Sequence, residues 1–110
     1  MKILLDENID VRFKLHFPSV YEVFTVRDMK WNGIKNGELI RLIEENKFNC
    51  WIIVDKNLPY QQNTESLPFV IIVLDVFRNT LKHVTALMPA VLSTLASLPD
   101  KKVIIISEPG

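Results

Sequence analysis

The chain has 110 residues, and its 13 Lys and Arg residues balance its 13 Asp and Glu residues, so the formal net charge is zero at pH 7. This length, with 48% hydrophobic residues, suits one domain with one core and excludes two independent catalytic domains. The charge balance excludes a global positive field that would draw the chain onto long nucleic acid. Any nucleic-acid partner must therefore be bound locally.

Cysteine usage and hydropathy point to the compartment. Cys50 is the only cysteine, which excludes an intramolecular disulfide and a multi-thiolate zinc site and favours a reducing environment. The longest uninterrupted apolar run, residues 69–74, is far shorter than the roughly 20 residues that a membrane span requires. The first apolar stretch ends at Asp6 and does not resemble an export signal. We therefore expect a cytoplasmic protein with no membrane association.

Short runs of β-branched and aromatic residues alternate with helical patterns along the chain. In chain order the sequence predicts a strand at residues 3–5, a short helix at 9–15, a strand at 21–26, a helix at 37–45, strands at 51–54 and 69–74, a long helical pattern at 81–98 and a last strand at 103–106. Several strands are apolar throughout, as in parallel sheets that helices cover on both faces. The sequence therefore predicts one α/β domain over residues 1–110, with a mostly parallel central sheet of about four or five strands flanked by helices.

The helical pattern at 81–98 has apolar residues at spacings of three and four, which predicts one stripe facing the core. The stripe consists of Leu81, Val84, Leu87, Met88, Val91, Leu92, Leu95 and Leu98. Pro89 lies inside the pattern, and a proline removes a helix hydrogen bond and clashes with the preceding turn. We expect a kink or a new helical segment at Pro89, and Asn79 is the expected cap of the first segment.

Acidic residues follow two predicted strands. Asp6 and Glu7 come directly after the first strand, Asp55 comes directly after the third, and Glu38 begins the helix between them. The carboxyl ends of parallel strands share one edge, where ligands collect. A carboxylate beside an apolar strand must be solvated, hydrogen-bonded or bound to a cation. We therefore expect Asp6, Glu38 and Asp55 to converge at this edge.

Each of these acids also has a structural explanation. Asp6 is a candidate cap for the helix at 9–15, and Glu38 can complement a helix dipole. Asp55 can open an Asx turn over residues 55–59. The combination on one predicted edge favours the functional interpretation.

Clustered carboxylates repel one another, and a hard divalent cation with oxygen ligands is the usual reason for them to be tolerated. The sequence thus predicts that Asp6, Glu38 and Asp55 bind Mg²⁺ or Mn²⁺. Phosphodiester hydrolysis is a common use of such a site, because a bound metal ion lowers the pKa of water and no covalent protein nucleophile is needed.

Three segments carry a family resemblance: MKILLDENI at the start, TVRDMKWNGIKNGELIRLI in the middle, and VDKNLPYQQN after them. Together they resemble the small PIN-like domain proteins, which are related to the toxin nucleases of bacterial toxin and antitoxin pairs. The similarity covers most of the chain, and residues 55–63 are its most specific part. It implies a three-layer PIN-like fold.

The resemblance also implies an activity, a hydrolase of the Mg²⁺- or Mn²⁺-dependent endoribonuclease type that cleaves single-stranded RNA. It assigns Asp6, Glu38 and Asp55 as both the catalytic and the metal-binding residues. PIN nucleases carry one further acid on an earlier helix, for which Glu7 and Asp28 are the candidates here. An antitoxin-like protein is the implied partner, and a homodimer is an assembly to test.

Further polar residues are candidates for roles around the site. Asn8, Asn57 and Gln61 can hold water or phosphate oxygens beside a metal. Lys56, Tyr60, Gln61 and Arg78 are the candidates for substrate binding, in which a cation meets a phosphate and an aromatic ring stacks on a base.

Two other classes of protein stay open. A receiver-type phosphoacceptor domain also pairs acids after its first strand with an aspartate after its third, but it needs a hydroxyl at the fourth strand end and a lysine after the fifth, and this sequence has neither. A non-catalytic PIN-like binding module would keep the fold and pair with a protein partner. Insensitivity to Mg²⁺ and Mn²⁺ would favour the binding module.

Overall fold

Five parallel strands form the middle layer of the protein. The structure is a computed structural model that describes residues 1–61, 63–98, 100 and 102–109. The side chains of Tyr60 and Gln61 lie outside that description. The strands are β1 (Lys2–Leu5), β2 (Glu22–Thr25), β3 (Cys50–Ile53), β4 (Val70–Asp75) and β5 (Val103–Ser107). Every predicted strand is present, and no bound moves by more than one residue. All four strand pairs are parallel, so the carboxyl ends lie along one edge of the sheet.

The strand order is β2-β1-β3-β4-β5. The chain therefore runs outward from β1 to β2, returns to the other side of β1 as β3, and then adds β4 and β5. In this doubly wound order the direction of winding changes between β1 and β3, and ligands bind at that point beyond the carboxyl ends. The sequence places Asp6 and Asp55 after the two strands concerned.

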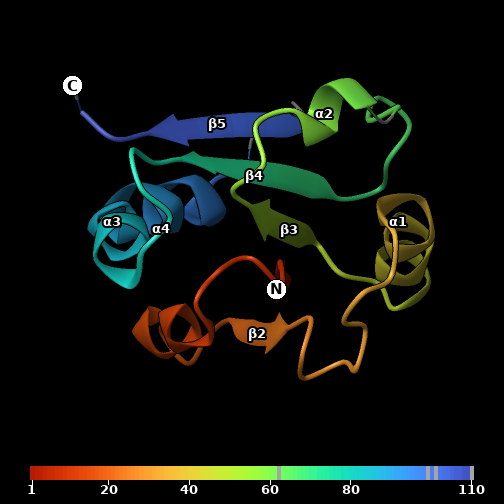
Figure 1. Cartoon of the computed structure of the whole chain (residues 1–110), viewed down its shortest axis with the longest axis horizontal. Helices are drawn as coiled ribbons and strands as arrows, with labels where there is room; N and C mark the ends of the chain where they lie inside the picture. Colours follow the sequence, from red (N-terminus) through yellow and green to blue (C-terminus); the bar gives the residue numbers. More distant parts are fainter. Residues whose placement is uncertain (62, 99, 101, 110) are drawn as a thin grey trace.

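Helices cover both faces of the sheet, so the fold has three layers (Figure 1). One helical layer contains the 3₁₀ helix η1 (Val11–His16), α3 (Leu81–Ala86) and α4 (Met88–Ala96), and the other contains α1 (Asn36–Glu45) and α2 (Leu58–Gln61). Alternate strand residues face the two layers: Ile52 and Ile72 pack toward α3 and α4, whereas Trp51 and Ile71 pack toward α1. This α/β architecture confirms the predicted fold class and is compatible with a PIN-like fold.

The helical pattern at 81–98 divides at Pro89, as expected. Pro89 lies in the first turn of α4, where its missing N–H leaves no helix hydrogen bond unmade. The predicted stripe packs entirely against the core on this face. Thr80, and not Asn79, caps α3, because the Thr80 hydroxyl accepts the backbone N–H of His83 at 3.3 Å.

Two local features differ from the expectation based on the sequence: the presence of α2 and the residue that caps η1. The four-residue helix α2 is too short to show a helical period in the sequence. The helix η1 is capped by Asp10 instead of Asp6, since the Asp10 carboxylate accepts the backbone N–H of Arg12 at 2.9 Å. Within the described residues, no helix is long and apolar enough to cross a membrane.

Candidate functional site

Asp6 is the buried acid at the carboxyl edge. Its backbone N–H donates to the carbonyl of Ile52 at 3.0 Å, so the hydrogen bonding between β1 and β3 extends into this residue and holds it in place. Asp6 is only 8% exposed. Burial raises the pKa of its carboxyl group to about 6, the charges of Glu7 and Asp55 add to the rise, and backbone N–H groups of Glu7 and Asn8 oppose it. A nearby positive charge would therefore stabilise the ionised form of Asp6.

Asp55 lies two residues beyond the end of β3, the strand next to β1. Its Oδ1 accepts the backbone N–H of Asn57 at 2.9 Å, which is the Asx turn expected from the sequence. Among the described residues, Oδ2 of Asp55 accepts no hydrogen bond. The turn therefore orients the carboxylate and leaves one oxygen for a ligand.

The two acids meet because of the strand order. Leu5 lies opposite Ile52 in the β1–β3 register, so the first residues beyond these strands emerge side by side. The charge of Asp55 is among the causes that raise the pKa of Asp6, after burial and the charge of Glu7. The acids thus occupy the point where the winding of the sheet reverses, which is the usual ligand position in this class of fold.

Glu38 lies in the first turn of α1 and is exposed. Within the part of the chain that the structure describes, no three His, Cys, Asp or Glu side chains are grouped closely enough to hold one metal ion. The structure therefore brings Asp6 and Asp55 together without gathering Glu38 into a preformed three-acid group. The position of Glu38 suits the alternative role of complementing the helix dipole.

The two candidates for a further acid differ. Glu7 is exposed, and its Oε2 accepts the backbone N–H of Gly33 at 3.4 Å. Asp28 belongs to the turn after β2: its Oδ2 accepts the backbone N–H of Thr25 and pairs with Lys14, each at 2.9 Å. Glu7 therefore stays near Asp6, whereas Asp28 is occupied by local structure.

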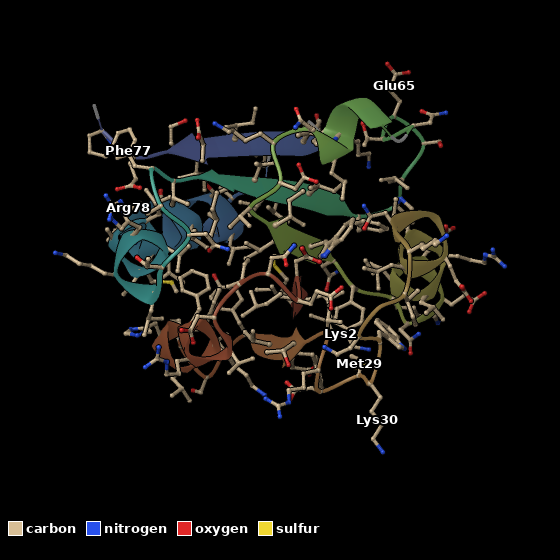
Figure 2. The ribbon with its side chains drawn as sticks, viewed as in Figure 1. Lys2, Met29, Lys30, Glu65, Phe77 and Arg78 are labelled. Carbon is tan, nitrogen blue, oxygen red and sulfur yellow. The ribbon has the colours of Figure 1, made fainter. Side chains whose placement is uncertain are left out.

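Two residues proposed for substrate contacts, Lys56 and Arg78, differ in their surroundings. Lys56 Nζ pairs with Asp75 Oδ1 at 3.1 Å, at the end of β4. Arg78 is exposed, and Figure 2 shows it with Phe77 on the side of the molecule where β5 ends. The side chains of Tyr60 and Gln61 lie outside the described residues.

The two asparagines are exposed and use their backbone groups locally. The carbonyl of Asn8 accepts a hydrogen bond from Asn79 Nδ2 at 2.6 Å, and the backbone N–H of Asn57 donates to Asp55. The contact with Asn79 fixes the loop after β1 to the loop after β4. Both loops border the carboxyl edge.

A cavity of about 220 Å³ opens beside Asp6, between the ends of β1 and β2. It is lined by Asp6, Glu7, Ile9, Val11, Thr25, Val26, Arg27 and Asn32. Arg27 and Asn32 are not among the site residues expected from the sequence. Both residues follow β2, which belongs to the same parallel sheet, and this position is the signal that could have identified them. Asp55 is not among the residues that line this cavity, so only Asp6 of the acid pair borders it.

Asp75 is a further acid at the carboxyl edge of the sheet, and it is not among the expected site residues although it directly follows the apolar run 69–74. A hydrogen bond from Lys56 is the main cause that lowers its pKa, and the Ser107 hydroxyl donates to it at 3.2 Å. Asp75 is therefore a neutralised, structurally paired acid, in contrast to Asp6. An aspartate at this strand end also occupies the place where a receiver-type domain needs a hydroxyl.

The pair formed by Asp6 and Asp55 suits a hard divalent cation. Both offer carboxylate oxygens, and Mg²⁺ in proteins is commonly held by one or two carboxylates, with water and substrate oxygens completing its octahedron. Burial is the main cause of the raised pKa of Asp6, with smaller contributions from the charges of Glu7 and Asp55, and a nearby cation would favour the ionised form of this carboxyl group. By donor chemistry, these two carboxylates are ligands of the type that Mg²⁺ and Mn²⁺ prefer.

No protein-family model matches the chain, and no curated protein and no solved structure matches it either.

Proposed function

We propose that this protein is a metal-dependent ribonuclease-like hydrolase that cleaves phosphodiester bonds of single-stranded RNA at the carboxyl edge of its sheet. The observation that carries the proposal is the buried acid Asp6, whose pKa is raised to about 6 by burial and by the charges of Glu7 and Asp55. An isolated buried carboxylate is costly to a fold. A site that accepts this cost at a ligand-binding position is a candidate functional site.

The roles of the chain's own residues follow from their positions. Asp6 and Asp55 would hold a Mg²⁺ or Mn²⁺ ion, which supplies Lewis-acid activation of water and of the phosphodiester when bound. Arg27 lines the cavity beside Asp6, where its guanidinium can donate two parallel hydrogen bonds to two oxygens of a phosphate group. Asn32, on the same cavity wall, can donate to a sugar or base oxygen.

A local site also agrees with the overall charge. The chain is neutral and cannot hold a long polyanion by charge alone. Short single-stranded segments presented to the cavity suit this charge better than extended duplexes. The PIN-like resemblance adds a toxin role with an antitoxin-like protein partner to the proposal.

The test is cleavage of a mixed pool of short single-stranded RNAs by purified protein in Mg²⁺, Mn²⁺ or EDTA. Asp6→Asn and Asp55→Asn keep the shape of each side chain and remove its charge. Glu65→Gln is the matched control, because Glu65 is exposed and Figure 2 shows it projecting into solvent from the loop before β4. We expect metal-dependent cleavage by the wild type and the control, and none by the two Asp variants.

A second readout separates folding from chemistry. Circular dichroism and thermal melts of all variants establish that each is folded before activity is compared. Equal background cleavage in the wild type and the variants, with no metal-induced rise in thermal stability, would overturn the nuclease proposal. The acids would then be structural, and the non-catalytic binding module would be the better description.

A further inference from the structure

Strand β5 forms one border of the sheet, and its outer edge is unpaired among the described residues. Its inner edge pairs with β4, and two hydrogen bonds at the ends of this ladder show which backbone groups point inward. The carbonyl of Lys102 accepts the N–H of Ile71 at 2.8 Å, and the N–H of Glu108 donates to the carbonyl of Asp75 at 3.1 Å. Because backbone groups alternate in direction along a strand, the N–H and C=O groups of Val103, Ile105 and Ser107 point outward.

The other border of the sheet is protected in a way that β5 is not. On β2 the N–H of Glu22 bonds to Met1 and the N–H of Val26 bonds to Leu5, so Thr25 is an outward-pointing residue. Its N–H is taken by the carboxylate of Asp28 at 2.9 Å. A charged side chain thus occupies an outward N–H at the carboxyl end of β2, and charged side chains on edge strands are a common way for proteins to prevent strand addition.

The β5 edge carries no such protection. The strand reads VIIIS without a charged residue, a proline or a glycine, and Ile105 is 53% exposed. Ile105 pairs with Val73 of β4 and therefore faces the α1 side of the sheet. An exposed, apolar and uncharged edge strand is a template for pairing with another strand.

We propose that β5 pairs in antiparallel orientation with β5 of a second copy of this chain, around a two-fold axis at Ile105, to form a continuous sheet across a homodimer. The hydrogen-bond directions select this register. Antiparallel partners exchange bonds only between outward-pointing residues. Centring the axis on Ile105 pairs Ile105 with Ile105 of the second copy and Val103 with Ser107 of the second copy. This is the one symmetric register in which all three outward-pointing residues of both copies form hydrogen bonds.

The side chains match in the same register. Ile104 lies opposite Ile106 of the second copy, and the two Ile105 side chains meet at the axis. Lys102 lies opposite Glu108 of the second copy at both ends of the paired segment, which places opposite charges across from each other. Glu108 is held in place by His83 Nδ1 at 2.9 Å and by the backbone N–H of Phe77 at 2.7 Å. The zero net charge of the chain adds no long-range repulsion between copies.

The proposed dimer is independent of the nuclease proposal. Antiparallel pairing of β5 directs the two carboxyl edges toward opposite ends of the joined sheet. Strands β3 and β4 also separate β5 from Asp6. Each copy would therefore keep its own site, and no residue of one copy would complete the site of the other.

The first test measures oligomeric state by light scattering and sedimentation over a wide range of protein concentration. We expect a dimer in the wild type. Ile105→Lys places like charges directly opposite each other at the axis and should raise the dimer dissociation constant by about tenfold or more. Leu15→Lys is the matched control, since Leu15 is 80% exposed on η1 and lies outside the paired edge; it should leave the dimer intact.

The second test fixes the register by crosslinking. In a hydrogen-bonded antiparallel pair the Cα atoms are about 5.5 Å apart, which lies within the range of a disulfide. Ile105→Cys should therefore form a covalent dimer under mild oxidation, faster than Leu15→Cys. The native Cys50 does not interfere, because its thiol is buried and burial raises its pKa to about 12. A monomeric wild type, a dimer that survives Ile105→Lys, or equal crosslinking by the two cysteine variants would each overturn the proposal.

Discussion

Asp6 and Asp55 lie near each other because β1 and β3 are adjacent in the sheet, although the two residues are far apart in the sequence. Asp6 is buried, and its pKa is raised to about 6, first by burial and then by neighbouring charges that include Asp55. The ionised pair is therefore unfavourable to the fold in the absence of a cation.

Asp6→Asn should stabilise the protein at pH 8. The folded pKa of about 6 exceeds the ordinary value of 3.8, so the stability that Asp6 contributes is fully present below pH 3.8 and is lost as the pH rises through about 6. A shift of this size corresponds to about 3 kcal/mol as an upper figure. Urea unfolding at pH 8 should show the variant more stable by about 1–3 kcal/mol, with little difference at pH 4. Glu65→Gln is the control, and equal stability of Asp6→Asn and wild type at pH 8 would contradict the prediction.

Divalent cations should also stabilise the wild-type protein at pH 8. Mg²⁺ or Mn²⁺ at pH 8 should raise the melting temperature of the wild type, because a ligand that binds only the folded state stabilises it by mass action. Asp6→Asn and Asp55→Asn should lose the rise. Glu38→Gln should keep most of it, since Glu38 is exposed and is not part of a preformed group of acids. Loss of the shift in Glu38→Gln would restore the three-acid site expected from the sequence.

The end of α1 contains a residue in an unfavourable backbone conformation. Lys47 has a φ of 58°, in the left-handed region that favours glycine. Its N–H donates to Glu44 and the N–H of Phe48 donates to Ile43, which is the Schellman pattern of a helix C-terminus. Lys47→Gly should therefore stabilise the fold by about 0.5–1 kcal/mol.

Thermal and urea unfolding of Lys47→Gly and Lys47→Ala test this explanation. The alanine variant removes the same side chain but keeps the strained conformation, so it should not be stabilised. If both variants change stability equally, the lost lysine side chain, and not the backbone conformation, is responsible.

The turn after β2 depends on a reciprocal contact between Thr25 and Asp28. Asp28 accepts the backbone N–H of Thr25, and the Thr25 hydroxyl accepts the N–H of Asp28, both at 2.9 Å. Asp28→Ala should cost about 1 kcal/mol at pH 7, a value reduced for the partial exposure of the carboxylate. The same change should also uncover the β2 edge, which sedimentation would reveal as increased self-association.

The pH dependence of Asp28→Ala has a defined sign. The N–H of Thr25 and then Lys14 lower the pKa of Asp28. Its contribution to stability is therefore present above the ordinary value of 3.8 and is lost as the pH falls through the folded pKa. The difference between Asp28→Ala and wild type in urea unfolding should shrink as the pH falls below 3.8. A difference that stays constant into this acid range would show that the carboxylate is not the stabilising group.

Much of the fold can be predicted from the sequence, because burial leaves a local signature. Apolar runs without alternation identify strands covered on both faces, and the spacing of apolar residues at 81–98 identifies a helical stripe. Pro89 marks the helix break for a local steric reason, and Asp55 forms its Asx turn within its own segment. Each of these features depends on residues close together in the chain.

The tertiary structure decided the composition of the site. Strand order depends on which apolar faces bury one another over long separations, and no local pattern encodes it. That order places Asp6 beside Asp55, adds Arg27 and Asn32 to the cavity wall, and leaves Glu38 outside a preformed group. The same strand order allows Lys56 to form an ion pair with Asp75 and leaves β5 at the border of the sheet. The chain's local chemistry therefore supplied the candidate residues, and long-range packing selected those that meet.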